Sequence, residues 1–334
     1  MKIETGAQVL EILRMSEEAF IRDVIPEARR TFDEQLGGKL RVTSMMGISN
    51  ICKNSCLYCG MRAGSTGLTR YRISPEDVIA AGNAAADAGF GRIFLISGED
   101  PGYGFDRLLR ITAALKERGM FVSLACGEWD AGQYRELRAA GADEYVIKFE
   151  MSRPESFNRL NPSTDFDRRM RSVQAVKDSG MLLASGNIVD WPGQTMDELA
   201  DDIMLMKALG ISWAPVIPYL PARGTPLAAE GGPGSRLLML REIAILRLMI
   251  PGVHITAQQP GADLTKGLSD PEGNAAAVNA GADVLFRDLL PDPQARSFRV
   301  IDFRNLTDGG HISRVAEMTG RAVDMAGELI HEHQ

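Results

Sequence analysis

The chain has 334 residues, of which 45% are apolar and 24% are charged, and its net charge at pH 7 is −7. This balance supports a full hydrophobic core and argues against a nucleic-acid partner or an anionic membrane surface, since both attract clustered Lys and Arg. No stretch approaches the roughly 20 apolar residues of a membrane span, and no apolar signal segment is visible. With only four cysteines and no disulfide framework, we expect a cytoplasmic protein.

Residues 3–37 have the pattern of amphipathic helix, which ends at Gly37 and Gly38. From residue 40 onward, short β-prone runs alternate with helical patterns. Strands are predicted at 40–48, 92–97, 121–126, 144–150, 182–189, 213–219, 253–257 and 283–286. Helices are predicted between them at 74–89, 105–119, 130–141, 164–180 and 195–210, several of them ending in Gly.

Eight strand–helix alternations predict a parallel (β/α)8 barrel of the TIM type, complete or nearly so. A doubly wound open sheet is the alternative, but no G-x-G-x-x-G phosphate loop follows the first strand. We expect three parts: an N-terminal helical cap at 1–38, the barrel at 39–293, and a C-terminal segment at 294–334 that closes one end of the barrel.

Three of the four cysteines, Cys52, Cys56 and Cys59, lie within eight positions directly after the first strand. That loop belongs to the C-terminal mouth of a barrel, where active sites of this fold are built. A structural zinc site needs four closed ligands, and Cys126 could supply the fourth. A four-cysteine zinc or iron–sulfur protein with a structural or sensing role is therefore the non-enzymatic alternative. Three thiolates on a 4Fe-4S cluster instead leave one iron open for chemistry.

The Cx3Cx2C spacing, with Tyr58 before the last cysteine, resembles the radical S-adenosylmethionine (SAM) superfamily. The resemblance implies that Cys52, Cys56 and Cys59 hold a 4Fe-4S cluster whose open iron binds SAM. One electron from the cluster would then cleave SAM to a 5′-deoxyadenosyl radical that acts on a small-molecule substrate. It also implies a low-potential electron donor of the flavodoxin or ferredoxin type.

Further segments carry the same resemblance. "ISGED" (96–100) is similar to the family's GGE-type motif, which receives the SAM ammonium, and "GNIVDWPGQT" (186–195) is similar to its adenine-contact motif. Glu150 stands where relatives bind the SAM ribose, and Arg169, or its neighbour Arg168, is the candidate for the SAM carboxylate. The predicted cofactor-binding residues are Tyr58, Gly98, Glu99, Glu150, Arg169 and Ile188.

Within the superfamily, residues from about 40 to 325 resemble the group that contains the FeFe-hydrogenase maturase HydE, the methylornithine synthase PylB and biotin synthase. "CLYCG" and "GEW" are most similar to the maturase. The second cluster of biotin synthase needs further cysteines that this chain lacks. The resemblance thus favours HydE-like chemistry, with a PylB-like amino-acid mutase or a divergent relative with its own small substrate as alternatives.

The expected substrate contacts follow from position at the strand ends. Maturase-like members line the barrel floor with Arg on the fourth strand and paired Thr on the seventh, whereas this chain has Glu144 and Lys148, then Gln258 and Gln259. Cys126 is predicted to be catalytic, as a hydrogen donor or substrate ligand, with a buried inert cysteine as the alternative. Asp100 is predicted to orient the substrate. The predicted substrate-binding residues are Ser123, Lys148, Thr256, Gln258, Gln259 and Arg287.

Overall fold

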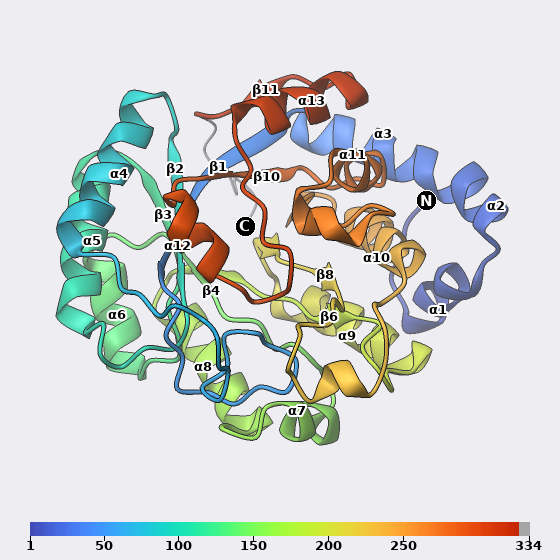
Figure 1. Cartoon of the computed structure of the whole chain (residues 1–334). Helices are drawn as coiled ribbons and strands as arrows, with labels where there is room; N and C mark the ends of the chain where they lie inside the picture. The colour runs from blue at the N-terminus through green and yellow to red at the C-terminus, as the bar shows by residue number, and fades with distance from the viewer. Residues whose placement is uncertain (327–334) are drawn as a thin grey trace.

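The computed structural model describes residues 1–326, in which parallel strands curl into a barrel inside a ring of helices (Figure 1). In order around the barrel the strands are β10 (Val284–Asp288), β1 (Leu40–Ser49), β2 (Arg92–Ser97), β3 (Phe121–Ala125), β4 (Glu144–Val146), β5 (Leu182–Ala184), β7 (Trp213–Ala214) and β9 (His254–Ile255). The remaining gap between β9 and β10 is closed by backbone hydrogen bonds from Asp283 to Ile255 (3.1 Å) and from Ala257 to Val284 (2.8 Å). The predicted (β/α)8 barrel is confirmed.

Two of the predicted strands are interrupted. The run 182–189 divides into β5 and β6 (Ile188–Val189), and the run 213–219 divides into β7 and β8 (Ile217–Pro218). β6 and β8 pair with each other as a separate parallel sheet. Pro215 contributes to the break because it has no N–H to donate to a neighbouring strand.

The five predicted helices are present as α4 (Pro75–Asp87), α5 (Phe105–Glu117), α6 (Ala131–Ala139), α8 (Phe166–Asp178) and α9 (Met196–Leu209). Side chains of Ser74, Asp130, Asp165 and Thr195 cap the N-termini of four of them. The sequence patterns did not predict α7 (Pro154–Leu160), α10 (Arg236–Met249), α11 (Pro271–Asn279), or the 3-10 turns η2 (Leu227–Ala229) and η3 (Leu264–Ser269).

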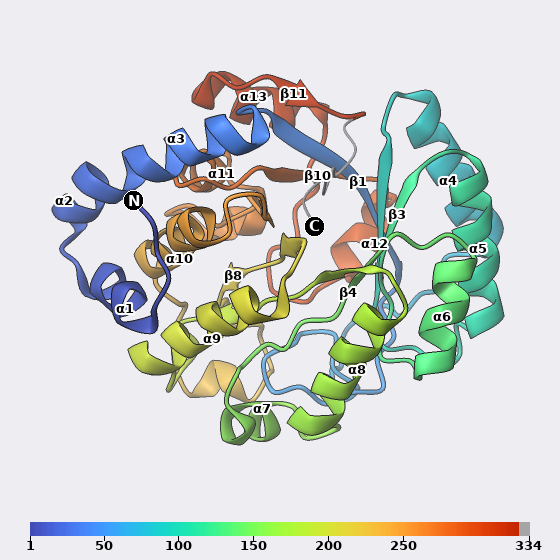
Figure 2. The same cartoon turned by 180° about the vertical axis from the view of Figure 1, so that it is seen from behind.

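The N-terminal segment is helical, as predicted, and consists of α1 (Gly6–Arg14), α2 (Glu17–Ala19), the π-helical turn η1 (Phe20–Val24) and α3 (Ile25–Leu36). These helices lie outside the ring and pack on α9 and α10 (Figure 2). Val9, Leu13 and Phe32 are fully buried in this contact region. Gly37 ends α3 in a left-handed conformation with φ 65°.

The C-terminal segment contains α12 (Asp292–Ser297), α13 (Gly309–Thr319) and β11 (Val323–Asp324), which pairs with the start of β1. The part between α12 and α13 crosses the C-terminal mouth of the barrel. The division of the chain at residues 38 and 293 stays a prediction, and residues 327–334 of the third part lie outside the described residues. No helix within residues 1–326 is long and apolar enough to cross a membrane.

A buried pair of acids lies where α9 and α10 meet the barrel. Asp202 and Glu242 are fully buried, and the side-chain amide of Asn187 donates to a carboxyl oxygen of each at 3.3 Å. Burial raises the pKa of Asp202 to about 7 and that of Glu242 to about 8. The folded protein therefore holds protons on this pair that the unfolded chain releases at lower pH.

Replacing Glu242 by Gln should reduce the loss of stability with rising pH. Carboxyl groups in the unfolded chain ionise near roughly pH 4, whereas Asp202 and Glu242 in the folded protein have pKa values of about 7 and about 8. Between these pH values the folded state binds more protons than the unfolded state. The free energy of unfolding therefore falls as the pH rises. Between pH 5.5 and 8.5 the Gln variant should lose about 1 to 3 kcal/mol less than the wild type in denaturant unfolding. The exposed-site control Glu11→Gln should keep the wild-type slope, and an unchanged slope in Glu242→Gln would contradict the prediction.

Candidate active site

A cavity of about 400 Å³ lies in the C-terminal mouth of the barrel. Its upper wall comes from residues that follow the strand ends, and its floor comes from residues inside the strands. The segment between α12 and α13 covers it, with Phe298, Val300, Ile301 and Phe303 among the lining side chains. This is the position at which barrels of this type carry their active sites.

The three clustered cysteines face this cavity from the loop after β1. Cys52, Cys56 and Cys59 all line it as half-buried free thiols. Burial raises the pKa of Cys56 and of Cys59 to about 12, so a metal that binds them must displace their protons. Arg70 holds the loop by donating to several of its carbonyls, including that of Asn50 at 2.5 Å. Sequence analysis missed Arg70, because a backbone-binding arginine has no motif of its own.

Cys126, predicted as a catalytic thiol, does not line the cavity. It is buried directly after β3, and its Sγ lies 3.7 Å from the carbonyl oxygen of Leu95. Burial raises its pKa to about 12. This corrects the predicted placement and agrees with the alternative of a buried inert cysteine.

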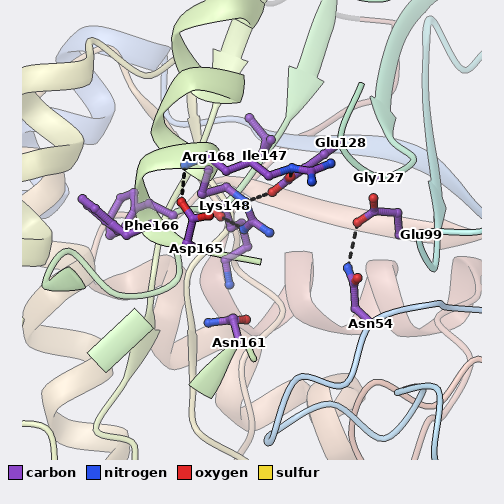
Figure 3. Close-up of polar contacts among 12 residues, drawn as sticks. Asn54, Glu99, Gly127, Glu128, Ile147, Lys148, Asn161, Asp165, Phe166 and Arg168 are labelled. Atoms are coloured by element: carbon purple, nitrogen blue, oxygen red, sulfur yellow. Dashed lines mark hydrogen bonds and ion pairs between the residues drawn. The ribbon is translucent and has the colours of Figure 1, made fainter. Parts of the chain in front are cut away.

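Glu99 follows β2, and its carboxylate faces the cysteine loop (Figure 3). It accepts a hydrogen bond from the Asn54 side-chain amide at 2.7 Å and lies 2.7 Å from the Lys53 ammonium. Gly98 permits this close approach, because a Cβ there would lie 2.2 Å from the carbonyl oxygen of Ile51. Asn54, inside the cysteine motif, is a lining residue that sequence analysis missed.

Arg169 lines the cavity from α8, and Glu128 orients it. The Arg169 Nε donates to a Glu128 carboxylate oxygen at 2.5 Å, and its Nη1 donates to the carbonyl of Lys148. Burial acts to lower the pKa of Arg169, but the combined effect of Glu128, Tyr58 and Glu150 raises it, and the net shift is upward. Arg168, the neighbouring candidate, pairs with the other Glu128 oxygen at 3.1 Å and has a side chain that is 54% exposed. Figure 3 shows Glu128 near Arg168, and sequence analysis had assigned Glu128 no role.

Glu150 follows β4 in a left-handed conformation, with φ 61°. Two backbone hydrogen bonds hold it there: its N–H donates to Gly186 at 3.0 Å, and its carbonyl accepts from Ile188 at 3.1 Å. Its carboxylate lies 3.0 Å from the Lys148 ammonium, and Glu150, Lys148 and Ile188 all line the cavity. A strained non-glycine backbone at a cavity wall is typical of a functional position.

Tyr58 and Asp100 differ in their placement. Tyr58 lines the cavity and its hydroxyl donates to the Asn161 side chain at 2.8 Å. Asp100 does not line it: its carboxylate accepts hydrogen bonds from Nε and Nη2 of Arg72, at 2.7 and 2.8 Å, and from the Ser49 hydroxyl at 2.7 Å. Asp100 thus joins β1 to the loop after β2 and lies off the cavity wall, and its role toward a substrate stays a prediction.

The floor of the cavity is apolar and aromatic. Phe94, Trp213 and Phe286 form a cluster of rings whose centroids lie 5.1 to 5.8 Å apart. The Thr256 hydroxyl accepts a hydrogen bond from the Trp213 indole at 3.0 Å. The Gln258 side chain donates to the Phe286 carbonyl at 3.3 Å. Thr256 and Gln258 therefore line the cavity while hydrogen-bonded to two residues of the aromatic cluster.

Two buried charged residues, Glu144 and Arg92, lie deeper in the barrel than the floor and are not part of the cavity lining. Glu144 precedes the lining residue Val146 by two positions on β4, and Arg92 likewise precedes Phe94 on β2. Glu144 is fully buried and accepts hydrogen bonds from two serine hydroxyls, that of Ser123 among them at 2.7 Å. The Ser123 hydroxyl therefore bonds to Glu144 and does not line the cavity, and its substrate role stays a prediction.

Two further predicted substrate residues bond to backbone carbonyls and are not part of the cavity lining. Gln259 donates to the backbone carbonyls of Val216 at 2.9 Å and Thr256 at 3.0 Å. Arg287 donates to the carbonyl of Thr307 at 3.2 Å. Neither side chain lines the cavity, because each stabilises backbone at the strand ends. Of the predicted set, the cavity wall contains Lys148, Thr256 and Gln258.

The donor set fits a 4Fe-4S cluster with SAM better than a mononuclear zinc ion. Three free thiols face one cavity that also contains the carboxylates of Glu99 and Glu150 and the guanidinium of Arg169. Within residues 1–326, no three His, Cys, Asp or Glu side chains converge on a single ion. A 4Fe-4S cluster places its thiolates on separate iron atoms, so its ligands need no common point.

The chain matches the model of the radical SAM superfamily over residues 46–206. The FeFe hydrogenase maturase subunit HydE of Thermotoga maritima is 32% identical to it over 312 residues, which cover 89% of this chain and 87% of that protein. The chain therefore belongs to the radical SAM superfamily and is an enzyme of that class. Membership implies a 4Fe-4S cluster and SAM as cofactors.

Two other relatives span most of the chain. The 3-methylornithine synthase of Methanosarcina barkeri is 26% identical over 294 residues, which cover 87% of this chain and 81% of that protein. The crystal structure of methylornithine synthase (PylB) superposes with a TM-score of 0.84 at 24% identity, covering 96% of this chain and 94% of that one. At this identity the superposition shows a shared fold.

Removal of one thiol at a time separates a three-cysteine from a four-cysteine cluster. After anaerobic reconstitution, we expect Cys126→Ala to bind about four iron atoms, as the wild type does, and Cys56→Ala to bind fewer than about one. Iron and acid-labile sulfide analysis gives the counts. Loss of a buried thiol costs Cys126→Ala only about 1 kcal/mol, so its folding can be checked by circular dichroism. Loss of iron from Cys126→Ala would favour the four-cysteine alternative.

Proposed function

We propose that this enzyme cleaves SAM reductively and directs the resulting 5′-deoxyadenosyl radical at a small molecule held in the barrel cavity. The proposal is carried by one observation: Cys52, Cys56 and Cys59 stand on the wall of the same cavity that the candidate SAM-binding residues line. When bound, the cluster would supply the electron that breaks the S–C5′ bond.

The surrounding side chains are suited to hold SAM in one orientation. We assign Arg169 to the SAM carboxylate, because a guanidinium offers two parallel donors to that group. Glu99 is assigned to the SAM ammonium and Glu150 to the ribose hydroxyls, with Gly98, Tyr58 and Ile188 as further cofactor contacts. Glu128 is a positioning residue, since it fixes Arg169 through a 2.5 Å hydrogen bond.

The segment between α12 and α13 keeps water and loose side chains away from the radical. The backbone N–H of Gly60 donates to the carbonyl of Val300 at 2.8 Å, and the Asn50 amide donates to that of Ser297 at 2.8 Å. These bonds fasten the cover to the cysteine loop. A dry, closed cavity prevents a reactive intermediate from being quenched.

For the particular reaction, we propose chemistry of the hydrogenase-maturase type. The support is the 32% identity to HydE over 87% of that protein's length. The electron donor would be a low-potential protein of the flavodoxin or ferredoxin type. A reducing cytoplasmic setting is proposed with it, because all four cysteines are free thiols.

The second candidate is an amino-acid rearrangement of the methylornithine synthase type. The TM-score of 0.84 to PylB favours a barrel of the same shape, and 3-methylornithine synthase aligns over 87% of this chain. Genes for hydrogenase maturation or for pyrrolysine use beside this gene would separate the two candidates.

Conservative changes at two adjacent arginines test the SAM carboxylate site. Both Arg168 and Arg169 pair with Glu128, but Arg169 lines the cavity, whereas Arg168 does not. Arg169→Lys should weaken SAM binding by about tenfold through loss of the paired donors, and the matched control Arg168→Lys should change it by less than about twofold. Titration of the reduced enzyme with SAM, followed by EPR, gives both affinities. Equal effects of the two changes would count against the assignment of Arg169.

The radical chemistry itself has a direct assay. The reconstituted enzyme, reduced with dithionite and given SAM, should release 5′-deoxyadenosine, and Cys56→Ala should release none. The EPR signal of the reduced cluster should also change when SAM is added. Zinc in place of iron, or a cluster signal that ignores SAM, would overturn the proposal.

A further inference from the structure

We infer that the substrate of this enzyme carries a carboxylate group, and that Arg304 binds this group on the side of the cavity opposite to the proposed SAM site. The inference rests on the proposed radical chemistry and adds a substrate class and a binding residue to it. It agrees with an amino-acid rearrangement, because every amino acid carries a carboxylate. It also narrows the small molecules that a reaction of the maturase type can use.

One base of the cavity lining takes no part in the proposed SAM site. The lining contains three bases, Lys148, Arg169 and Arg304. Arg169 is assigned to the SAM carboxylate, and the Lys148 ammonium lies 3.0 Å from Glu150, the proposed ribose contact. Arg304 belongs instead to the cover between α12 and α13. Its guanidinium therefore remains for a second ligand with a negative charge.

Arg304 lies across the barrel from the proposed SAM carboxylate site. Its Nη2 donates to the carboxylate of Asp288, the last residue of β10. Arg169 donates to the carbonyl of Lys148, which follows β4. In the order of strands around the barrel, three strands separate β10 from β4 in either direction. A carboxylate that is bound by Arg169 thus leaves Arg304 free for another.

The guanidinium of Arg304 is held in place while part of it stays free. Asp288, whose side chain is 1% exposed, accepts from Nη2, and the Asn305 carbonyl accepts from Nη1 at 3.0 Å. The Nε has no acceptor within residues 1–326, and each Nη carries a further proton. Glu128 fixes Arg169 in the same manner. Parallel donors on an oriented guanidinium match the two oxygens of a carboxylate.

The backbone next to Arg304 is strained. Phe303 lines the cavity in a left-handed conformation with φ 56°, which a bulky residue rarely adopts. Gly267 supports it from η3, where a Cβ would lie 2.2 Å from the Phe303 carbonyl oxygen. The Ser269 hydroxyl also donates to the carbonyl of Asn305 at 2.9 Å. Strain that the surrounding structure maintains at a cavity wall is typical of a ligand-binding position.

The rest of the substrate would lie on the aromatic floor. Phe94, Trp213 and Phe286 offer it apolar surface. The Oε1 of Gln258, a lining residue, accepts no hydrogen bond within residues 1–326, so it can receive an ammonium or hydroxyl group. A small acid gains burial of its hydrocarbon part there, while Arg304 compensates its charge. The structure therefore favours a small acid with an apolar chain.

Two probes of nearly equal shape test the preference for a carboxylate. Hexanoate and hexanamide differ in charge but hardly in size. With the reconstituted enzyme and saturating SAM, which occupies Arg169, calorimetric titration should show that hexanoate binds at least about tenfold more tightly than hexanamide. Equal or tighter binding of hexanamide, or no detectable binding of hexanoate, would overturn the inference.

Removal of the charge at position 304 tests where the carboxylate binds. Arg304→Gln should bring the affinities of the two probes to within about twofold of each other. The matched control is Arg299→Gln, because Arg299 belongs to the same cover and pairs with Asp302 at 3.1 Å but does not line the cavity. It should keep the wild-type preference. A cover that is merely loosened would weaken both probes alike, so an unchanged preference in Arg304→Gln would overturn the inference.

The binding readout keeps this inference distinct from the proposed function. Release of 5′-deoxyadenosine by an enzyme without a preference for hexanoate would refute the carboxylate site alone. Absence of 5′-deoxyadenosine from a fully reconstituted cluster that still prefers hexanoate would refute the radical chemistry. The bound acid would then no longer count as a substrate of that chemistry.

Discussion

The close contact between the loops after β1 and β2 is the constraint on which the rest of the site depends. Gly98 packs against the carbonyl of Ile51, where a Cβ would come within 2.2 Å, and the Lys53 N–H donates to the carbonyl of Glu99 at 2.9 Å. The thiol loop and the carboxylate of Glu99 are therefore one structural unit. Any side chain at position 98 would push the loop outward and separate the proposed cluster ligands from the proposed SAM ammonium site.

The interior of the barrel is layered by polarity. At the N-terminal end, Asp283 bonds to the buried His254 at 2.6 Å and to Arg247 at 3.0 Å, and the buried side chains of Arg92 and Glu144 also lie within the barrel. Burial lowers the pKa of His254 to about 4 and that of Arg92 to about 10. The buried charges of Asp283, His254 and Arg247 are tolerated because these three side chains are partners of one another. The rings of Phe94, Trp213 and Phe286 then separate this network from the cavity.

This layering assigns different tasks to the two zones of the cavity. The upper wall carries paired charges that are already oriented, as Glu128 orients Arg169, and such preorganised groups suit a charged cofactor. The floor consists of neutral, largely aromatic side chains. The cover formed by Phe298 to Phe303 closes both zones together.

The sequence predicted the barrel and the upper wall because both depend on local signals. Alternating strand and helix patterns give the fold, and the ends of parallel strands converge at one mouth, so Cys52, Glu99 and Glu150 were placed there correctly. It also separated the helical N-terminal segment, since the periodicity and the terminal Gly37 are local features. The sequence did not predict the roles of Arg70, Asn54 and Glu128, because these roles consist of contacts with backbone or side chains elsewhere in the chain.

The amino-acid sequence by itself therefore determined the (β/α)8 barrel and the cysteine loop at its mouth. Only the tertiary structure decided which inward-facing residues reach the cavity and which are occupied elsewhere. Val146 lines the cavity and Glu144 lies below it, although both face inward from β4. Asp100, Ser123 and Cys126 also lie in strands or at strand ends, but each is hydrogen-bonded elsewhere. Asp100 binds Arg72, Ser123 binds Glu144, and Cys126 contacts the Leu95 carbonyl. The physical reason has two parts. The depth of a side chain in the barrel depends on the stagger of neighbouring strands, and its freedom to bind a ligand depends on hydrogen-bond partners that lie far along the chain. A local sequence pattern encodes neither of them.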